Sequence, residues 1–88
     1  MKTHFLVTVD SIYHGHGNME VESFLTYQEA SAYFEKRLST RFIDFPWLDV
    51  EDKFETCIEM SYQYERYEMY SEDEGSGIII ELEEFEDE

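Results

Sequence analysis

The first part of the chain alternates apolar and polar side chains. Apolar residues recur at every second position from Phe5 to Val9, which is the period of a strand with one buried face, and this predicts a strand over about residues 4–13. The stretch HGHGN follows, and its glycines and asparagine are typical of a turn. The alternation then resumes over about residues 19–25, with glutamates between the apolar positions. We therefore expect an N-terminal hairpin over about residues 4–25.

The period then changes from that of a strand to that of a helix. Apolar residues are spaced four apart from Ala30 to Leu38, which places them on one face of a helix. Thr26 and Glu29 have the spacing of a capping box, in which the two residues satisfy free backbone amides at the first turn. This pattern predicts a helix over about residues 27–39.

A connector rich in aromatic residues follows over residues 40–53. It contains the only proline of the chain, Pro46, with large apolar side chains on both sides of it. A free linker would not carry so much apolar surface. We expect the connector to fold back onto the core.

The segment 54–70 alternates Thr, Ile, Met and Tyr with polar residues, which favours a strand, although a helix is an alternative. After Arg66 the alternation slips by one position, and such a slip indicates a bulge. The stretch SEDEGSG then predicts a turn, and alternating isoleucines predict a last strand over about residues 77–85. Together these elements form a predicted C-terminal hairpin over about residues 54–85.

The predicted order is therefore β-β-α-β-β in a single domain, residues 1–88. Its 88 residues bury about 60–65% of the unfolded surface, and the aromatic content of 17% is enough for a small core. Strands joined by short turns pair antiparallel, and an amphipathic helix covers one face of such a sheet. The expected fold class is α+β, with an antiparallel sheet and one helix packed on one face.

Charge is distributed very unevenly along the chain. The 22 acidic and six basic residues give a formal net charge of −16. Residues 1–48 hold six acids and four bases, a net of −2, whereas residues 49–88 hold sixteen acids and two bases, a net of −14. This sign argues against direct binding to nucleic-acid phosphates or to an anionic membrane surface. Clustered charge creates a directional field, which spread-out charge does not.

The sequence also bears on location. A single cysteine, Cys57, excludes an internal disulfide. The apolar stretch near the start is too short for a signal peptide or a membrane span. We expect a cytoplasmic protein, in the host cytoplasm if a phage encodes it.

The acidic C-terminal hairpin also carries tyrosines. Residues two apart on a strand face the same way, so we expect Glu55, Glu59 and Glu65 on one face of the third strand, beside Glu81 and Glu83 of the last strand. Tyrosine gives a large contact area at low entropic cost and is enriched at protein interfaces. The complete set of expected partner-binding residues is Glu55, Glu59, Tyr62, Tyr64, Glu65, Tyr67, Glu68, Tyr70, Glu81, Glu83 and Glu84.

A plainer interpretation of the same charge is protection. Acidic residues on edge strands prevent aggregation, and here three consecutive isoleucines, Ile78 to Ile80, need that protection. The sequence does not favour either interpretation, a partner-binding surface or charge that prevents aggregation, over the other.

Other chemistry is weakly supported. Residues 72–83 match an EF-hand loop in outline, but a glutamate occupies its first position and strands are predicted around it. His14 and His16, with His4 across the hairpin, lack the spacing of a metal motif. Cys57 is expected to be a buried, inert thiol. We expect no catalytic residues, no cofactor, no metal site and no enzymatic activity.

Small size and clustered acidity resemble those of small acidic phage or plasmid proteins that imitate nucleic acid and block restriction or CRISPR enzymes. No motif carries this resemblance, so it assigns no residue a role. It implies a non-enzymatic inhibitor, of the anti-restriction or anti-CRISPR type, whose partner is a protein with a basic nucleic-acid-binding groove. The carboxylates would replace phosphates, and the tyrosines would anchor the contact.

Two further hypotheses stay open. One is a small adaptor or subunit that binds a protein through its sheet edge, with the charge serving solubility. The other is a cation-binding module. A homodimer is also compatible with the sequence.

Overall fold

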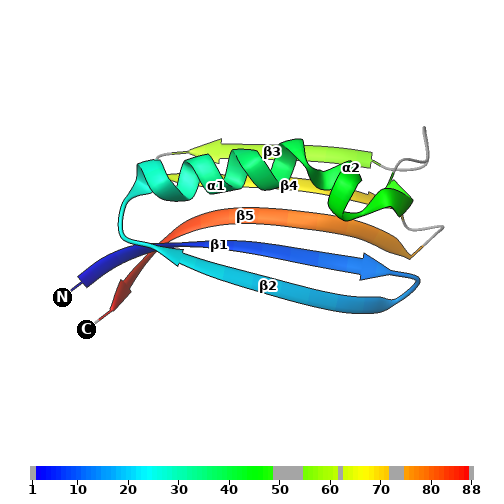
Figure 1. Ribbon diagram of the computed structural model, residues 1–88, viewed down its shortest axis with the longest axis horizontal. Helices are drawn as coiled ribbons and strands as arrows, with labels where there is room; N and C mark the ends of the chain where they lie inside the picture. The colour runs from blue at the N-terminus through cyan, green and yellow to red at the C-terminus, as the bar shows by residue number, and fades with distance from the viewer. Residues whose placement is uncertain (1, 49–54, 62, 72–74, 88) are drawn as a thin grey trace.

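One antiparallel sheet and one layer of helices make up the protein (Figure 1). The computed structural model describes residues 2–48, 55–61, 63–71 and 75–87. Five strands lie in the order β2-β1-β5-β4-β3, and every neighbouring pair is antiparallel. The elements are β1 (Lys2–Tyr13), β2 (His16–Phe24), α1 (Tyr27–Ser39), α2 (Arg41–Asp44), the 3-10 helix η1 (Pro46–Leu48), β3 (Glu55–Ser61), β4 (Tyr64–Ser71) and β5 (Ser76–Asp87).

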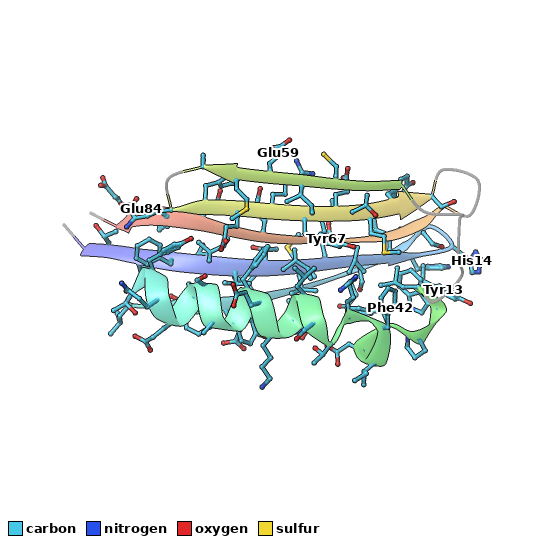
Figure 2. The ribbon with its side chains drawn as sticks, turned by 90° about the horizontal axis from the view of Figure 1, so that it is seen from above. Tyr13, His14, Phe42, Glu59, Tyr67 and Glu84 are labelled. Atoms are coloured by element: carbon cyan, nitrogen blue, oxygen red, sulfur yellow. The ribbon has the colours of Figure 1, made fainter. Side chains whose placement is uncertain are left out.

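The predicted fold class is confirmed. The chain follows the β-β-α-β-β order, with the third predicted strand divided into β3 and β4, and one main helix, α1, packs on one face of the antiparallel sheet (Figure 2). The N-terminal hairpin forms as expected, and its turn lies at His14 and Gly15, both with positive φ. Thr26 caps the first turn of α1, because its hydroxyl accepts from the Glu29 amide at 3.2 Å, while the Glu29 carboxylate accepts from that hydroxyl at 3.0 Å.

The structure of segment 54–70 differs from the prediction, which was one strand with a bulge. It contains two strands, β3 and β4, which form a hairpin in which Ser61 lies opposite Tyr64. Gln63, between them, has a φ of 53°, the left-handed conformation of a tight turn. Because of this turn, the residues that face the helices have even numbers in β3 and odd numbers in β4. The shift in the apolar alternation therefore marked a turn. The bulge and the alternative helix are both wrong.

The core lies between α1 and the two central strands. Ala30 and Phe34 of α1 pack on buried β1 and β5 side chains, among them Val7, Val9 and Ile80. The aromatic connector folds back as predicted, since Leu48 is buried and Phe45 and Trp47 pack against the core. Residues 49–53 of that connector lie outside the described residues.

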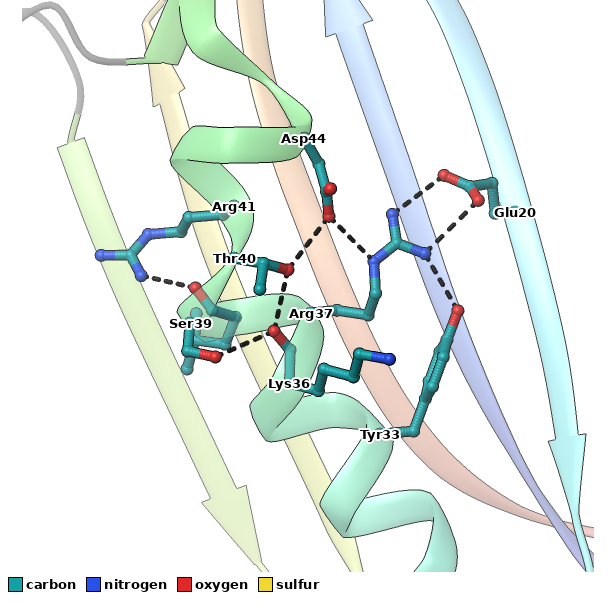
Figure 3. A network of polar contacts seen from close by, with 9 residues as sticks. Glu20, Tyr33, Lys36, Arg37, Ser39, Thr40, Arg41 and Asp44 are labelled. Carbon is teal, nitrogen blue, oxygen red and sulfur yellow. Dashed lines mark hydrogen bonds and ion pairs between the residues drawn. The ribbon is translucent and has the colours of Figure 1, made fainter.

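An arginine network ties α1 to β2 and α2 (Figure 3). The Arg37 guanidinium donates to both carboxylate oxygens of Glu20, at 3.1 and 3.3 Å, and to the Tyr33 hydroxyl at 2.9 Å. Its Nε lies 3.3 Å from the Asp44 carboxylate. These bonds, above all those to Glu20, raise the pKa of the guanidinium, so it stays charged although its side chain is largely buried. The network fixes α1 over the β2 side of the sheet.

Candidate functional site

The sheet has one face covered by helices and one that no described helix covers (Figure 2). Directly opposed residues of neighbouring strands share a face, and side chains alternate between faces along each strand. Since Val7, Leu82 and Tyr67 face the helices, their sequence neighbours point the other way. We call that second surface the open face. One row across it consists of Val21, Thr8, Glu81, Arg66 and Glu59.

Five carboxylates and one guanidinium belong to the open face among the side chains that the structure describes. The carboxylates are those of Asp10, Glu59, Glu68, Glu81 and Glu83. Neighbouring positions on such a surface are about 4.8 Å apart across strands and about 6.6 Å apart along them. Arg66 lies opposite both Glu59 and Glu81, and its guanidinium contacts the Glu68 carboxylate at 3.3 Å. One cation cannot neutralise five carboxylates, so this part of the face is anionic.

Tyr64 belongs to the acidic part of the open face. Its hydroxyl donates to the Glu81 carboxylate at 2.8 Å. This bond, followed by partial burial and the Glu81 charge, raises the pKa of Tyr64 above its ordinary value. The contact holds the Glu81 carboxylate in one position beside the ring.

Ionisation of Tyr64 provides a test of this contact. A pKa that is raised in the folded state means that the stabilisation is complete below the ordinary value of about 10 and is lost as pH rises through the folded pKa. We expect Glu81→Gln, which keeps an acceptor but removes the charge, to move one tyrosine to a lower pH in a phenolate absorbance titration. Tyr64→Phe should remove that tyrosine from the curve. Identical curves for wild type and Glu81→Gln would contradict the contact.

Tyr70 occupies the same surface at the far end of β4. It lies directly opposite Gly77 of β5, so its ring stands beside a position without a side chain. A carbon placed on Gly77 would be 2.6 Å from the Tyr70 ring, which shows how closely the ring approaches the backbone. Aromatic cover of this kind shields a glycine within a sheet.

The β2–β1 half of the open face carries four large apolar side chains, with polar residues such as Thr8 and Ser23 between them. Met19 and Val21 of β2 are exposed there, and Leu6 and Ile12 of β1 are half-buried beside them. An apolar strip therefore borders the anionic part of the face. Protein interfaces combine such apolar area with aromatic residues and a polar margin.

The structure divides the predicted partner-binding residues between the two faces. Six belong to the open face: Glu59, Tyr64, Glu68, Tyr70, Glu81 and Glu83. Three belong to the helix-covered face: Glu65, Tyr67 and Glu84. Tyr62 and the side chain of Glu55 lie outside the described residues. The expectation that Glu65 shares a face with Glu59 is wrong, because the turn before Tyr64 reverses the inward parity.

Glu65 and Tyr67 are core-facing. Their side chains are only 7% and 6% exposed, so neither can touch a partner in this fold. The Ser31 hydroxyl donates to the Glu65 carboxylate at 3.4 Å, while the guanidinium of Arg41 lies over the Tyr67 ring at 5.2 Å. The Glu65 charge and, more strongly, burial raise the pKa of nearby Tyr27. Both residues hold the helix layer on β4.

Asp10 is a surface residue that the sequence interpretation missed. It lies on the open face at the boundary between the apolar strip and the carboxylates. The signal was present, since Asp10 continues the outward positions of the alternation from Phe5 to Val9. Residues 1–48 have a net charge of only −2, so charge clustering along the chain does not mark Asp10.

The structure gives little support to the other candidate sites, which are the histidines, Cys57 and the EF-hand-like stretch. His4 lies near one end of β1, opposite Phe85, while His14 is in the turn at its other end, so the three histidines do not converge. Cys57 is exposed, not buried as predicted. The second half of the EF-hand-like stretch is paired strand in β5, and Glu72 and Glu74 lie outside the described residues. The described residues contain no group of three metal-ligating side chains.

Comparison with known proteins gives no information on function, so the geometry of the surface is the basis for the proposal below. No family model, curated protein or solved structure matches this chain. None of the described helices has the length and apolar character needed to cross a bilayer.

Proposed function

We propose that this protein is a non-enzymatic cytoplasmic inhibitor that binds the basic nucleic-acid site of a partner protein through the anionic part of its open face. The observation that carries the proposal is the group of five described carboxylates around a single described guanidinium, on a face that no described helix covers. A groove lined by Lys and Arg recognises regularly spaced anions. Carboxylates held on a rigid sheet supply them at a lower ordering cost than carboxylates on a flexible segment.

The side chains of the open face support recognition of a protein. Tyr64 and Tyr70 stand among the carboxylates, and the apolar strip adjoins them. Charge sets the association rate, and the aromatic and apolar area limits dissociation. The helix-covered side carries carboxylates too, including Glu20, but the Arg37 guanidinium neutralises that one.

Charge reversal on the open face tests the proposal. We expect Glu81→Lys/Glu83→Lys to slow association with the partner about tenfold or more at low salt, because it removes attraction and adds repulsion. The matched control is Glu22→Lys/Glu35→Lys, two exposed residues away from the open face, which changes the formal charge from −16 to −12 in the same way. Thermal unfolding should verify that both variants fold.

The partner is sought by capture on immobilised wild type, variant and control, with duplex DNA or RNA as competitor at fixed ionic strength. We expect nucleic-acid-binding proteins on wild type and control, displaced by the competitor and lost from the Glu81/Glu83 variant. The same proteins on all three surfaces, or retention that nucleic acid does not disturb, would refute the proposal.

A further inference from the structure

The two edge strands of the sheet differ in how they are protected. Free edges expose unpaired backbone N–H and C=O groups, and proteins guard them with lysine, proline or inward-pointing charge. On β2 the residues that face the helix layer include Glu20 and Glu22, and α1 packs against this strand with Arg37 bound to Glu20. The β2 edge therefore has inward-pointing charges and a helix beside it.

Among the described residues, the β3 edge has neither form of protection. Its residues ETCIEMS contain no lysine or proline, and β4 is its only neighbouring strand in the described part of the chain. Ile58 and Met60 face the helix side but are 64% and 70% exposed. Figure 2 shows β3 as the strand farthest from α1, which explains why the helix does not cover them.

The chemistry of β3 specifies what would pair with it. An added strand would place one set of side chains beside Ile58 and Met60, where apolar residues bury the exposed surface. Its alternate side chains would lie on the open face beside Glu59, where Lys or Arg is favoured. The net charge of −14 in residues 49–88 attracts the same basic segment over a longer range.

We propose that the free edge of β3 binds an extended segment of a partner protein in which apolar and basic residues alternate, which adds a sixth strand to the sheet. A second copy of this chain is a poor occupant, because two chains of charge −16 repel each other. Glu59 belongs to both surfaces, but the edge is separate from Glu81 and Glu83, and Met60 faces the helix side. Variants at Met60 therefore test this proposal, and variants at Glu81 and Glu83 test the inhibitory surface.

A labelled synthetic peptide of alternating Lys and Val is the probe. We expect saturable binding to the full chain, and Met60→Lys should weaken it about tenfold, because an inward-pointing lysine blocks the edge. Met19→Lys is the matched control, since Met19 is 62% exposed on the opposite edge strand and the charge change is identical. It should change the dissociation constant less than threefold. Binding should also protect from hydrogen exchange those alternate amides of residues 56–61 that point away from β4.

A second peptide separates strand pairing from charge attraction. Methylation of alternate backbone nitrogens keeps every side chain but removes the amides that pair with β3, so it should abolish binding. Equal binding of both peptides, or equal effects of Met60→Lys and Met19→Lys, would overturn the proposal. So would a stable dimer that Met60→Lys dissolves, because it would assign the edge to a second copy.

Discussion

Gly77→Ala should destabilise the fold by about 3 kcal/mol, an expectation that follows from the spacing of β4 and β5. The added carbon would meet the Met69 carbonyl oxygen and would lie 2.8 Å from Tyr70 Cα and 2.6 Å from the Tyr70 ring. Two of these neighbours are backbone atoms, so a side-chain rotation cannot relieve the overlap. Strands β4 and β5 would have to move apart. Urea unfolding monitored by circular dichroism measures the loss.

Gly17→Ala is the matched control. At Gly17 the nearest neighbour of an added carbon is the Ser11 carbonyl oxygen at 4.0 Å, which is ordinary contact. Alanine there also reduces the conformational freedom of the unfolded chain, so we expect a change within about 0.5 kcal/mol. Similar losses for the two variants would show that the close approach of β4 is not what makes alanine unfavourable at Gly77.

Ile80→Ala should cost about 4 kcal/mol, near the upper end for a large-to-small core substitution. Ile80 is 0% exposed and lies between Val9 of β1 and Tyr67 of β4, so strands on both sides hold the cavity open. An 88-residue domain has a total stability of about 4–13 kcal/mol. Ile80→Ala should therefore lose about a third or more of the folding free energy, which urea unfolding monitored by circular dichroism would measure.

A graded series keeps this prediction testable if Ile80→Ala does not fold. Ile80→Val removes one methylene and should cost about 1 kcal/mol. Ile58→Ala, on the exposed edge strand, should cost less than about 0.5 kcal/mol. A loss at Ile58 equal to that at Ile80 would mean that β3 is packed as tightly as the centre of the sheet, contrary to its exposure.

Much of the fold could be predicted because local patterns and tertiary structure agree. The alternation from Phe5 to Val9 and the four-residue spacing from Ala30 to Leu38 each place apolar side chains on the face that the core buries. The turn before Tyr64 was missed because Gln63 is not a typical turn residue, so only the shift in parity marked it. That shift admits two interpretations, a bulge and a tight turn, which a single sequence does not distinguish.

The candidate surface was harder to predict than the fold. Odd- and even-numbered residues of a strand face opposite sides of the sheet, so an error of one position assigns side chains to the wrong face. Because the turn before Tyr64 was not predicted, Glu65 and Tyr67 were expected on the surface, whereas the structure has them in the core. Strand order mattered as well. The apolar strip of β2 and β1 borders the carboxylates only because β5 lies between β1 and β4, and no local pattern specifies that neighbour.

The central position of β5 also has a consequence for how the protein is made. Synthesis proceeds from β1 towards β5, so both hairpins can form early, yet neither acquires its inner neighbour until β5 is available. The β1–β5 pairing joins residues as far apart as Lys2 and Asp87, and long-range antiparallel pairing of this kind folds slowly. Until β5 inserts, the inner edges of β1 and β4 are open to other chains. The acidic residues that flank β4 and β5 would keep nascent molecules apart during that interval, whatever they bind afterwards.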